Sequence, residues 1–221
     1  MRTLILASAS PRRQQLLALG GWSFEVRPAY ADETPLPGEA PEAFVRRLSE
    51  TKARIAAQGI NGHALVIGSD TTVVLDGEVM NKPADAAEAT AMLERLRGRT
   101  HEVLTAITVL DTATGAAYTD LARSRVPMRN YSADEVAAYV ATGDPLDKAG
   151  AYAIQHPGFQ PVVREAFVDC FANVMGLPLC HLLRRLRTLG VDALTDLPAE
   201  CQRFIPYDCS VYPRILDGHA D

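Results

Sequence analysis

Apolar and polar positions along the chain follow two different periods, which predict strands and helices in alternation. Short apolar runs are typical of buried strands, and apolar residues three or four positions apart are typical of amphipathic helices. The predicted strands cover residues 3–10, 22–26 and 64–80, the last with a tight turn at Asp76-Gly77, and a long hairpin covers 101–128 about a turn at 111–115. The predicted helices cover residues 11–19, 41–57, 86–97, 132–142 and 174–190.

This order of elements predicts an α/β fold, in which a twisted mixed sheet with flanking helices forms two lobes around a cleft. Ligands of such folds bind near the carboxyl ends of strands and in clefts between lobes. We expect one domain over residues 1–190, with 144–158 forming a loop that enters a short strand. Residues 191–221 contain proline breaks and no clean period, so they form either a packed extension or a loose tail.

Composition and charge exclude several classes of partner. The 22 basic and 27 acidic side chains give a net charge of −5, which argues against a broad surface for nucleic-acid polymers. No apolar run approaches the roughly 20 residues that span a bilayer, so we expect no membrane as a partner. The four cysteines lack a CxxC pair, so we expect reduced thiols in a cytoplasmic protein, with zinc or a disulfide as the alternative.

Two arginines stand in the first turn of the first predicted helix. Ser10 is a good N-cap and Pro11 suits the first helical position, which places Arg12 and Arg13 where a helix disfavours cations. They are either solvated surface arginines or ligands of an anion at the helix start, where backbone N–H groups and guanidinium forks both attract it. A polyphosphate is the natural candidate.

Further lysines and carboxylates could complete a polyphosphate site. Lys52 stands at the edge of an apolar helix stripe, and Lys82 lies in an extended loop, although each alone also fits a solvated lysine. A triphosphate is normally handled with a divalent cation, which prefers carboxylate oxygens. Asp70, at the carboxyl end of the run 64–69, is the first candidate ligand, with a capping or turn aspartate as the alternative. Glu33 and Asp147 are further candidates.

Seven separated blocks of sequence carry a resemblance to a known family. They read LASASPRRQQLL, SETKA, GSDTTV, NKPAD, GRTHEVLTA, LDKAGAYAIQ and VMGLPL. In order and spacing they resemble the Maf family of nucleoside triphosphate pyrophosphatases, from Leu4 to about Gly190. The resemblance implies an inosine triphosphatase-like fold, and hydrolysis between the α and β phosphates to a nucleoside monophosphate and pyrophosphate. It also implies Mg²⁺ or Mn²⁺ as the cofactor, a homodimer, and a role in cleaning the nucleotide pool.

The resemblance also implies roles for individual residues. Asp70 would accept a proton from water and help to hold the metal, and Glu33 would support the metal or the water. The residues that would bind the substrate are Ser10, Arg12, Arg13, Lys52, Thr71, Lys82 and Gln155.

The chain is most similar to the dTTP/UTP type within that family, through the second arginine of SPRR, the SDT triplet and the AYxIQ pattern. The side-chain amide of Gln155 can accept from a pyrimidine N3–H and donate to the neighbouring carbonyl, an edge that uracil and thymine share. Ala153 and His156 stand where the family usually has glycine, and His156 could narrow the base pocket or reach a ligand.

Two alternatives remain open at this point. One is a pyrophosphatase of the 7-methyl-GTP type. The other is a nucleotide-binding regulator of septum formation and cell division, which would need the basic residues but no catalytic base. Asp70 favours the enzyme. No Walker-type phosphate loop is present.

Overall fold

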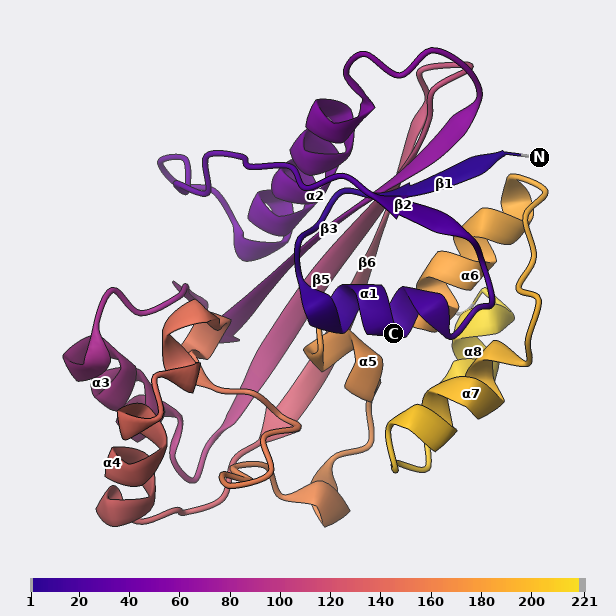
Figure 1. Cartoon of the computed structure of the whole chain (residues 1–221). Helices are drawn as coiled ribbons and strands as arrows, with labels where there is room; N and C mark the ends of the chain where they lie inside the picture. The colour runs from indigo at the N-terminus through magenta and orange to yellow at the C-terminus, as the bar shows by residue number, and fades with distance from the viewer. Residues whose placement is uncertain (1, 219–221) are drawn as a thin grey trace.

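The computed structural model describes residues 2–218, and its centre is one mixed sheet that runs the length of the molecule (Figure 1). The strand order is β2-β1-β3-β5-β6, and β4 pairs with β3. The strands are β1 (Thr3–Leu6), β2 (Phe24–Val26), β3 (Ala64–Leu75), β4 (Glu78–Met80), β5 (Thr100–Asp111) and β6 (Ala117–Pro127). Strand β1 is parallel to β2 and β3, whereas the remaining pairs are antiparallel.

Helices cover both faces of this sheet. They are α1 (Pro11–Ala18), α2 (Pro41–Ala57), α3 (Ala86–Leu96), α4 (Ala133–Ala141), α5 (Phe171–Val174), α6 (Leu179–Thr188), α7 (Leu197–Phe204) and α8 (Tyr212–Leu216). Figure 1 shows α2 on one face, α1, α5 and α6 on the other, and α3 and α4 at the far end. This arrangement confirms the predicted α/β class, and the predicted hairpin of β5 and β6 is confirmed with it.

Successive side chains of β3 pack alternately on the two faces of the sheet. Val66 and Val74 pack with α2, while Leu65, Ile67 and Val73 join the larger core on the opposite side. Because successive side chains of a strand point to opposite faces, a strand covered on both sides reads as a continuous apolar run. Most of β3 is therefore buried on both faces, and Thr71 alone among its residues is partly exposed.

The segment 144–158 differs from its prediction. It forms two 3-10 turns, η1 (Asp144–Asp147) and η2 (Ala149–Ala151), and then irregular backbone, so the predicted short strand is wrong. Gly150 and Ala151 have φ of 67° and 61°, which an extended strand does not allow. A side chain at Gly150 would meet Val73 at 2.8 Å, so the backbone passes close to β3 here.

The predicted helix over 174–190 is divided into α5 and α6. Gly176 has a φ of 101° and Pro178 precedes the first residue of α6. Glycine tolerates this backbone conformation and proline has no N–H to continue a helix, so the chain turns between the two.

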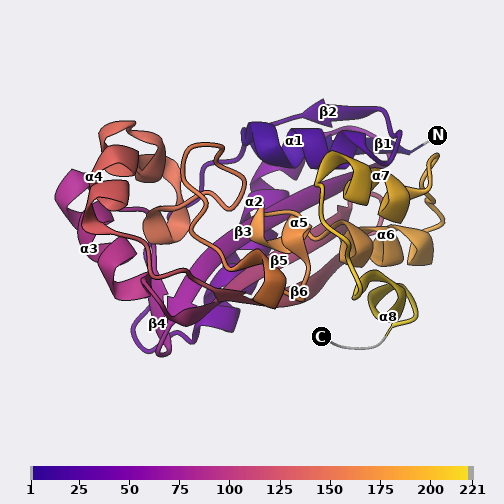
Figure 2. The same cartoon turned by 90° about the horizontal axis from the view of Figure 1, so that it is seen from below.

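The residues after Gly190 pack against the rest of the molecule, which decides between the two alternatives for 191–218. Leu197, Ile205 and Ile215 are buried, and Figure 2 shows α7 and α8 lying beside α6. The Trp22 indole donates a hydrogen bond to the Asp192 carbonyl at 2.8 Å. The predicted domain 1–190 includes Met1 and the predicted segment 191–221 includes residues 219–221, and these four residues lie outside the described part of the chain.

The four cysteines all lie within the described residues, and they come together where α7 and the loop after it pack against α5 and α6. They are free thiols that line one small cavity of about 20 Å³ between α5, α6, α7 and the loop that follows α7. Burial raises the pKa of the Cys180 and Cys201 thiols to about 12.

Candidate active site

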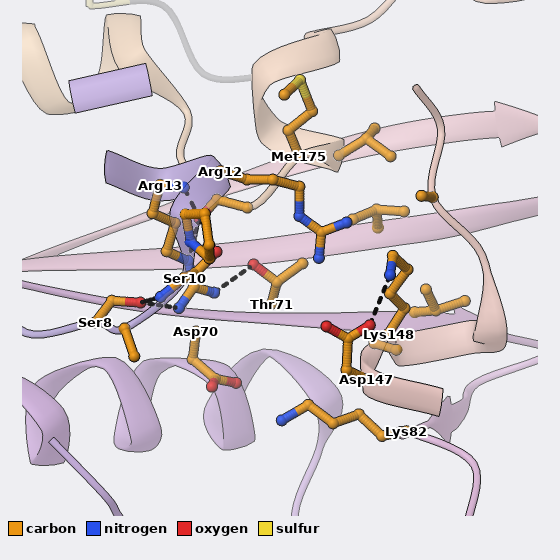
Figure 3. Close-up of a pocket in the computed structure, with 18 of the residues that line it drawn as sticks. Ser8, Ser10, Arg12, Arg13, Asp70, Thr71, Lys82, Asp147, Lys148 and Met175 are labelled. Atoms are coloured by element: carbon orange, nitrogen blue, oxygen red, sulfur yellow. Dashed lines mark hydrogen bonds and ion pairs between the residues drawn. The ribbon is translucent and has the colours of Figure 1, made fainter. Parts of the chain in front are cut away.

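A cavity of about 1010 Å³ opens beside the middle of β3 (Figure 3). Its walls come from the start of α1, the loop before α2, α2 itself, the loop after β4, and the segment that contains η1 and η2. All nine predicted site residues line it: Ser10, Arg12, Arg13, Glu33, Lys52, Asp70, Thr71, Lys82 and Gln155.

Asp70 lies inside β3 and not at its end. The strand continues to Leu75, but its parallel pairing with β1 stops at Ile67, so Asp70 follows the last parallel pair. It points to the α2 face, and its neighbour Thr71 points to the α1 face. The alternative of a capping or turn aspartate is therefore wrong. The predicted position at the carboxyl end of a strand is therefore wrong, because β3 continues for five residues beyond Asp70.

Lys52 of α2 joins two carboxylates. Its ammonium donates to Asp70 Oδ1 at 2.6 Å and to Glu33 Oε1 at 2.7 Å. The Lys52 and Asp70 side chains are only 9% and 8% exposed, whereas Glu33 is 44% exposed at the open side of the cavity. Gly68 makes this contact possible, because a Cβ there would stand 2.1 Å from the Ser49 carbonyl oxygen of α2.

The pKa values of the Asp70 and Glu33 carboxyl groups are shifted in opposite directions. Burial raises the pKa of the Asp70 carboxyl above its ordinary value, although Lys52 and Arg13 oppose the shift. Burial acts the same way on Glu33, but the hydrogen bond and charge of Lys52, with help from Lys82 at 3.4 Å, bring the pKa of that carboxyl below its ordinary value. The surroundings thus favour the protonated form of Asp70 and the ionised form of Glu33.

Arg13 approaches β3 from the opposite face and is held by three acceptors. Its Nε donates to the Gly176 carbonyl at 2.8 Å, Nη2 to Thr71 Oγ1 at 3.1 Å, and Nη1 to Ser8 Oγ at 3.4 Å. Burial lowers the pKa of this guanidinium, and Asp70 acts against the shift.

The start of α1 holds the predicted cap and both arginines. Ser10 is the N-cap, and its Oγ accepts from the Arg13 N–H at 3.5 Å. Figure 3 shows Arg12 extending into the cavity from this turn, while Arg13 turns toward Thr71. The two guanidinium groups therefore occupy different surroundings, one open to a ligand and one anchored in protein.

A second charged cluster lies on the η1 side, and only Asp147 of this cluster was a candidate from the sequence. Lys148 is 8% exposed, and its ammonium donates to the Asp144 carbonyl at 2.6 Å, to Asp144 Oδ1 at 2.8 Å and to Asp147 Oδ1 at 2.6 Å. Asp147, a metal candidate by sequence, is paired with this lysine. The LDKAG block contained the signal, but a lysine next to an aspartate resembles a solvated one until its burial is known.

Tyr139 of α4 contacts the segment that contains Gln155, the residue predicted to contact the nucleobase of a substrate. Its hydroxyl donates to Asp144 Oδ2 at 2.7 Å and accepts from the Ala153 N–H at 3.1 Å. The Tyr139 ring also meets the His156 ring edge to face, with centroids 4.9 Å apart. Gln155 is exposed beside it. Tyr139 therefore connects the charged η1 cluster to the predicted base-reading segment.

Asp70 and Glu33 carry the type of oxygen ligand that divalent cations such as Mg²⁺ prefer. Among residues 2–218, no group of three or more His, Cys, Asp or Glu side chains is arranged to hold a metal ion. Asp70 and Glu33 nevertheless converge on one cation, the Lys52 ammonium, which stands between them. Mg²⁺ is commonly bound by one or two carboxylates together with substrate phosphates, and Asp70 and Glu33 are the two carboxylates of the cavity that share one cation.

Within residues 2–218, none of the helices has the length and apolar character that a membrane crossing requires.

Comparisons with known proteins agree with the sequence blocks. The chain is 46% identical over 188 residues to a dTTP/UTP pyrophosphatase of Geobacter sp. (strain M21), covering 85% of this chain and 96% of that relative. It is 44% identical over 188 residues to a dTTP/UTP pyrophosphatase of Citrifermentans bemidjiense, with the same coverage. Among solved structures, the Staphylococcus aureus Ham1 protein aligns with a TM-score of 0.47 and 14% identity, covering 76% of this chain and 81% of that one. The family model described as Maf-like protein matches residues 3–189, and the chain therefore belongs to the Maf-like protein family.

Proposed function

We propose that this protein is a metal-dependent nucleoside triphosphate pyrophosphatase that converts dTTP and UTP to the monophosphate and pyrophosphate. One observation carries the proposal: Arg12, Lys52 and Lys82 line the same cavity as Asp70, a buried carboxyl group with a raised pKa. A polyphosphate needs the cations and its hydrolysis needs a base. The relatives named dTTP/UTP pyrophosphatase support the choice of substrate.

The chemistry follows from the positions of these groups. Arg12, Lys52 and Lys82 bind the phosphates and offset the charge that develops on the leaving pyrophosphate. A water oxygen bonds to the α-phosphorus as the bond from that phosphorus to the bridging oxygen breaks, and Asp70 takes the proton of the water. Asp70 and Glu33 would hold a Mg²⁺ or Mn²⁺ ion, which supplies positive charge to the phosphoryl oxygens.

Gln155 would select the nucleobase. It lies at the exposed end of the segment that Tyr139 organises, where its amide can pair with the shared edge of uracil and thymine. A bound base without that edge would bury the amide without a partner, at a cost of about 1–3 kcal/mol. We therefore expect Gln155→Leu to reduce the preference for dTTP and UTP over CTP and ATP, whose bases have no ring N–H at this edge.

The test is a panel of canonical and modified triphosphates, assayed for pyrophosphate with Mg²⁺ or Mn²⁺. We expect Asp70→Asn to lose at least about a hundredfold in kcat, because general-base catalysis contributes that much. The matched control is Asp147→Asn in the same cavity, whose carboxylate is 78% exposed and is held by Lys148. Orthophosphate as the product, or an Asp70→Asn variant as active as the parent, would contradict the proposal.

The same panel separates the alternatives. A preference for 7-methyl-GTP would assign the other family type, and tight nucleotide binding without turnover would favour the cell-division regulator. A role in cleaning the nucleotide pool, a homodimeric state and a cytoplasmic location also belong to this proposal, and light scattering in solution tests the dimer.

A further inference from the structure

The Lys52 ammonium occupies the place between the two carboxylates that the proposed function assigns to a metal. It lies 2.6 Å from Asp70 Oδ1 and 2.7 Å from Glu33 Oε1, both of them charge-assisted hydrogen bonds. Two of its three N–H donors are therefore directed at carboxylates. In the proposed function the same lysine binds phosphate, so it must exchange one set of partners for the other.

The surroundings of Lys52 explain why it holds this place. Asp70 is buried, and an unpaired carboxylate there would be costly, since water is largely excluded from it. Arg13 lies on the other face of β3, where it is held by Gly176, Thr71 and Ser8. Lys82 reaches only Glu33, at 3.4 Å, and its side chain is 54% exposed. Among the described residues, Lys52 is thus the cation that bonds to both carboxylates.

We propose that Lys52 is a built-in counter-ion that keeps a free divalent cation out of the site, so that the metal enters together with the phosphates of the nucleotide. This rests on the proposed function and adds an order of binding to it. A metal ion that arrives alone meets a positive charge between its two ligands and is repelled. A triphosphate offers new acceptors to the ammonium, and the flexible lysine stem lets it move to them. Its departure releases both carboxylates to the cation.

The test measures Mn²⁺ binding by electron paramagnetic resonance, without nucleotide and in mildly alkaline buffer. We expect Lys52→Gln, which keeps a donor but loses the charge, to bind Mn²⁺ at least about tenfold more tightly than the parent, since the repulsion is removed. Lys52→Arg keeps the charge and should bind as weakly as the parent. Arg54→Gln is the matched control, because it removes an exposed positive charge of the same helix that pairs with Glu50 outside the cavity, and it should change the affinity little.

Two further measurements locate the effect. Adding Asp70→Asn to Lys52→Gln should abolish the tighter binding, which places the ion on that carboxylate. In the parent protein, inorganic tripolyphosphate should increase the amount of Mn²⁺ bound to the protein, and this result does not depend on whether any variant folds.

Equal Mn²⁺ affinity in the parent and Lys52→Gln would overturn the inference, as would tighter binding by Lys52→Arg. A parent that binds Mn²⁺ as strongly without tripolyphosphate as with it would also overturn it. These outcomes are separate from the fate of the proposed function. An enzyme that releases pyrophosphate but shows no effect of Lys52 on Mn²⁺ affinity refutes only the order of binding. A protein with the Mn²⁺ effect and no pyrophosphate product refutes only the activity.

Discussion

Gly68 lets α2 approach β3 closely, so Gly68→Ala should push α2 away from the strand and change the geometry of the candidate site. The new methyl group would stand 2.1 Å from the Ser49 carbonyl oxygen and 2.9 Å from the Ala53 backbone nitrogen. Both are backbone atoms of a buried helix face, so no side-chain rotation can relieve the overlap. The helix must move away by about 1 Å or more, because close-packed interiors have no spare volume.

That displacement has two measurable consequences. Overpacking typically costs about 1–3 kcal/mol, and we expect about 3 kcal/mol here because the backbone itself is displaced. The movement also withdraws Lys52 from Asp70, so pyrophosphate release should fall together with stability. Stability is measured by urea unfolding and activity by pyrophosphate release under saturating triphosphate.

Gly158→Ala is a suitable control for this experiment. A methyl group there meets only the His156 ring, at 3.3 Å, and that ring can rotate. We expect its unfolding free energy to stay within about 1 kcal/mol of the parent value. If Gly68→Ala unfolds at the same urea concentration as the parent and keeps full turnover, the close approach of α2 does not position the site.

Three further predictions follow from the shifted pKa values. The acid limb of kcat/KM should lie above the ordinary carboxyl pKa of 3.8, because a base must be unprotonated and burial raises the pKa of Asp70. Lys52→Gln should move that limb to higher pH, since Lys52 favours the ionised form; a shift to lower pH would exclude Asp70 as the base. Burial lowers the pKa of His101 from 6.5 to about 3, so the unfolded chain binds a proton in that interval that the folded one does not. Unfolding free energy should therefore fall by up to about 1.4 kcal/mol per pH unit as pH drops below 6.5, and urea titrations should show a smaller slope for His101→Gln. The thiols of Cys180 and Cys201, with pKa values of about 12, should react slowly with iodoacetamide in the native protein and rapidly in guanidinium; fast native labelling would contradict their burial.

The successful sequence predictions rest on local signals. The helices predicted over 86–97 and 132–142 are confirmed as α3 and α4, where Asp85 is the N-cap and Ser132 forms a capping box with Glu135. The long hairpin was visible because its apolar pattern and turn residues agree over neighbouring positions. The candidate site residues were identifiable for a different reason, since their blocks resemble those of a family whose sites are known.

Other features depend on contacts between distant parts of the chain. The backbone of 149–151 is set by close passage over Val73, and a pattern of apolar residues does not reveal that contact. The partner of Arg13 on the α5–α6 turn, the carbonyl of Gly176, lies 163 positions away in sequence. Lys148 has the sequence context of a surface lysine, but in the folded protein it is buried and bonded to Asp144 and Asp147.

The sequence by itself determined the fold class and the family, and it identified the charged residues that line the cavity apart from Asp144 and Lys148, because short-range periodicity and the order and spacing of blocks do not require coordinates. The tertiary structure alone decided which charges meet. It directs Lys52 to both carboxylates, anchors Arg13 against protein acceptors and leaves Arg12 directed into the cavity. Ion-pair energies depend on separation and burial at the scale of ångströms, and those quantities exist only after β3, α1 and α2 have packed together.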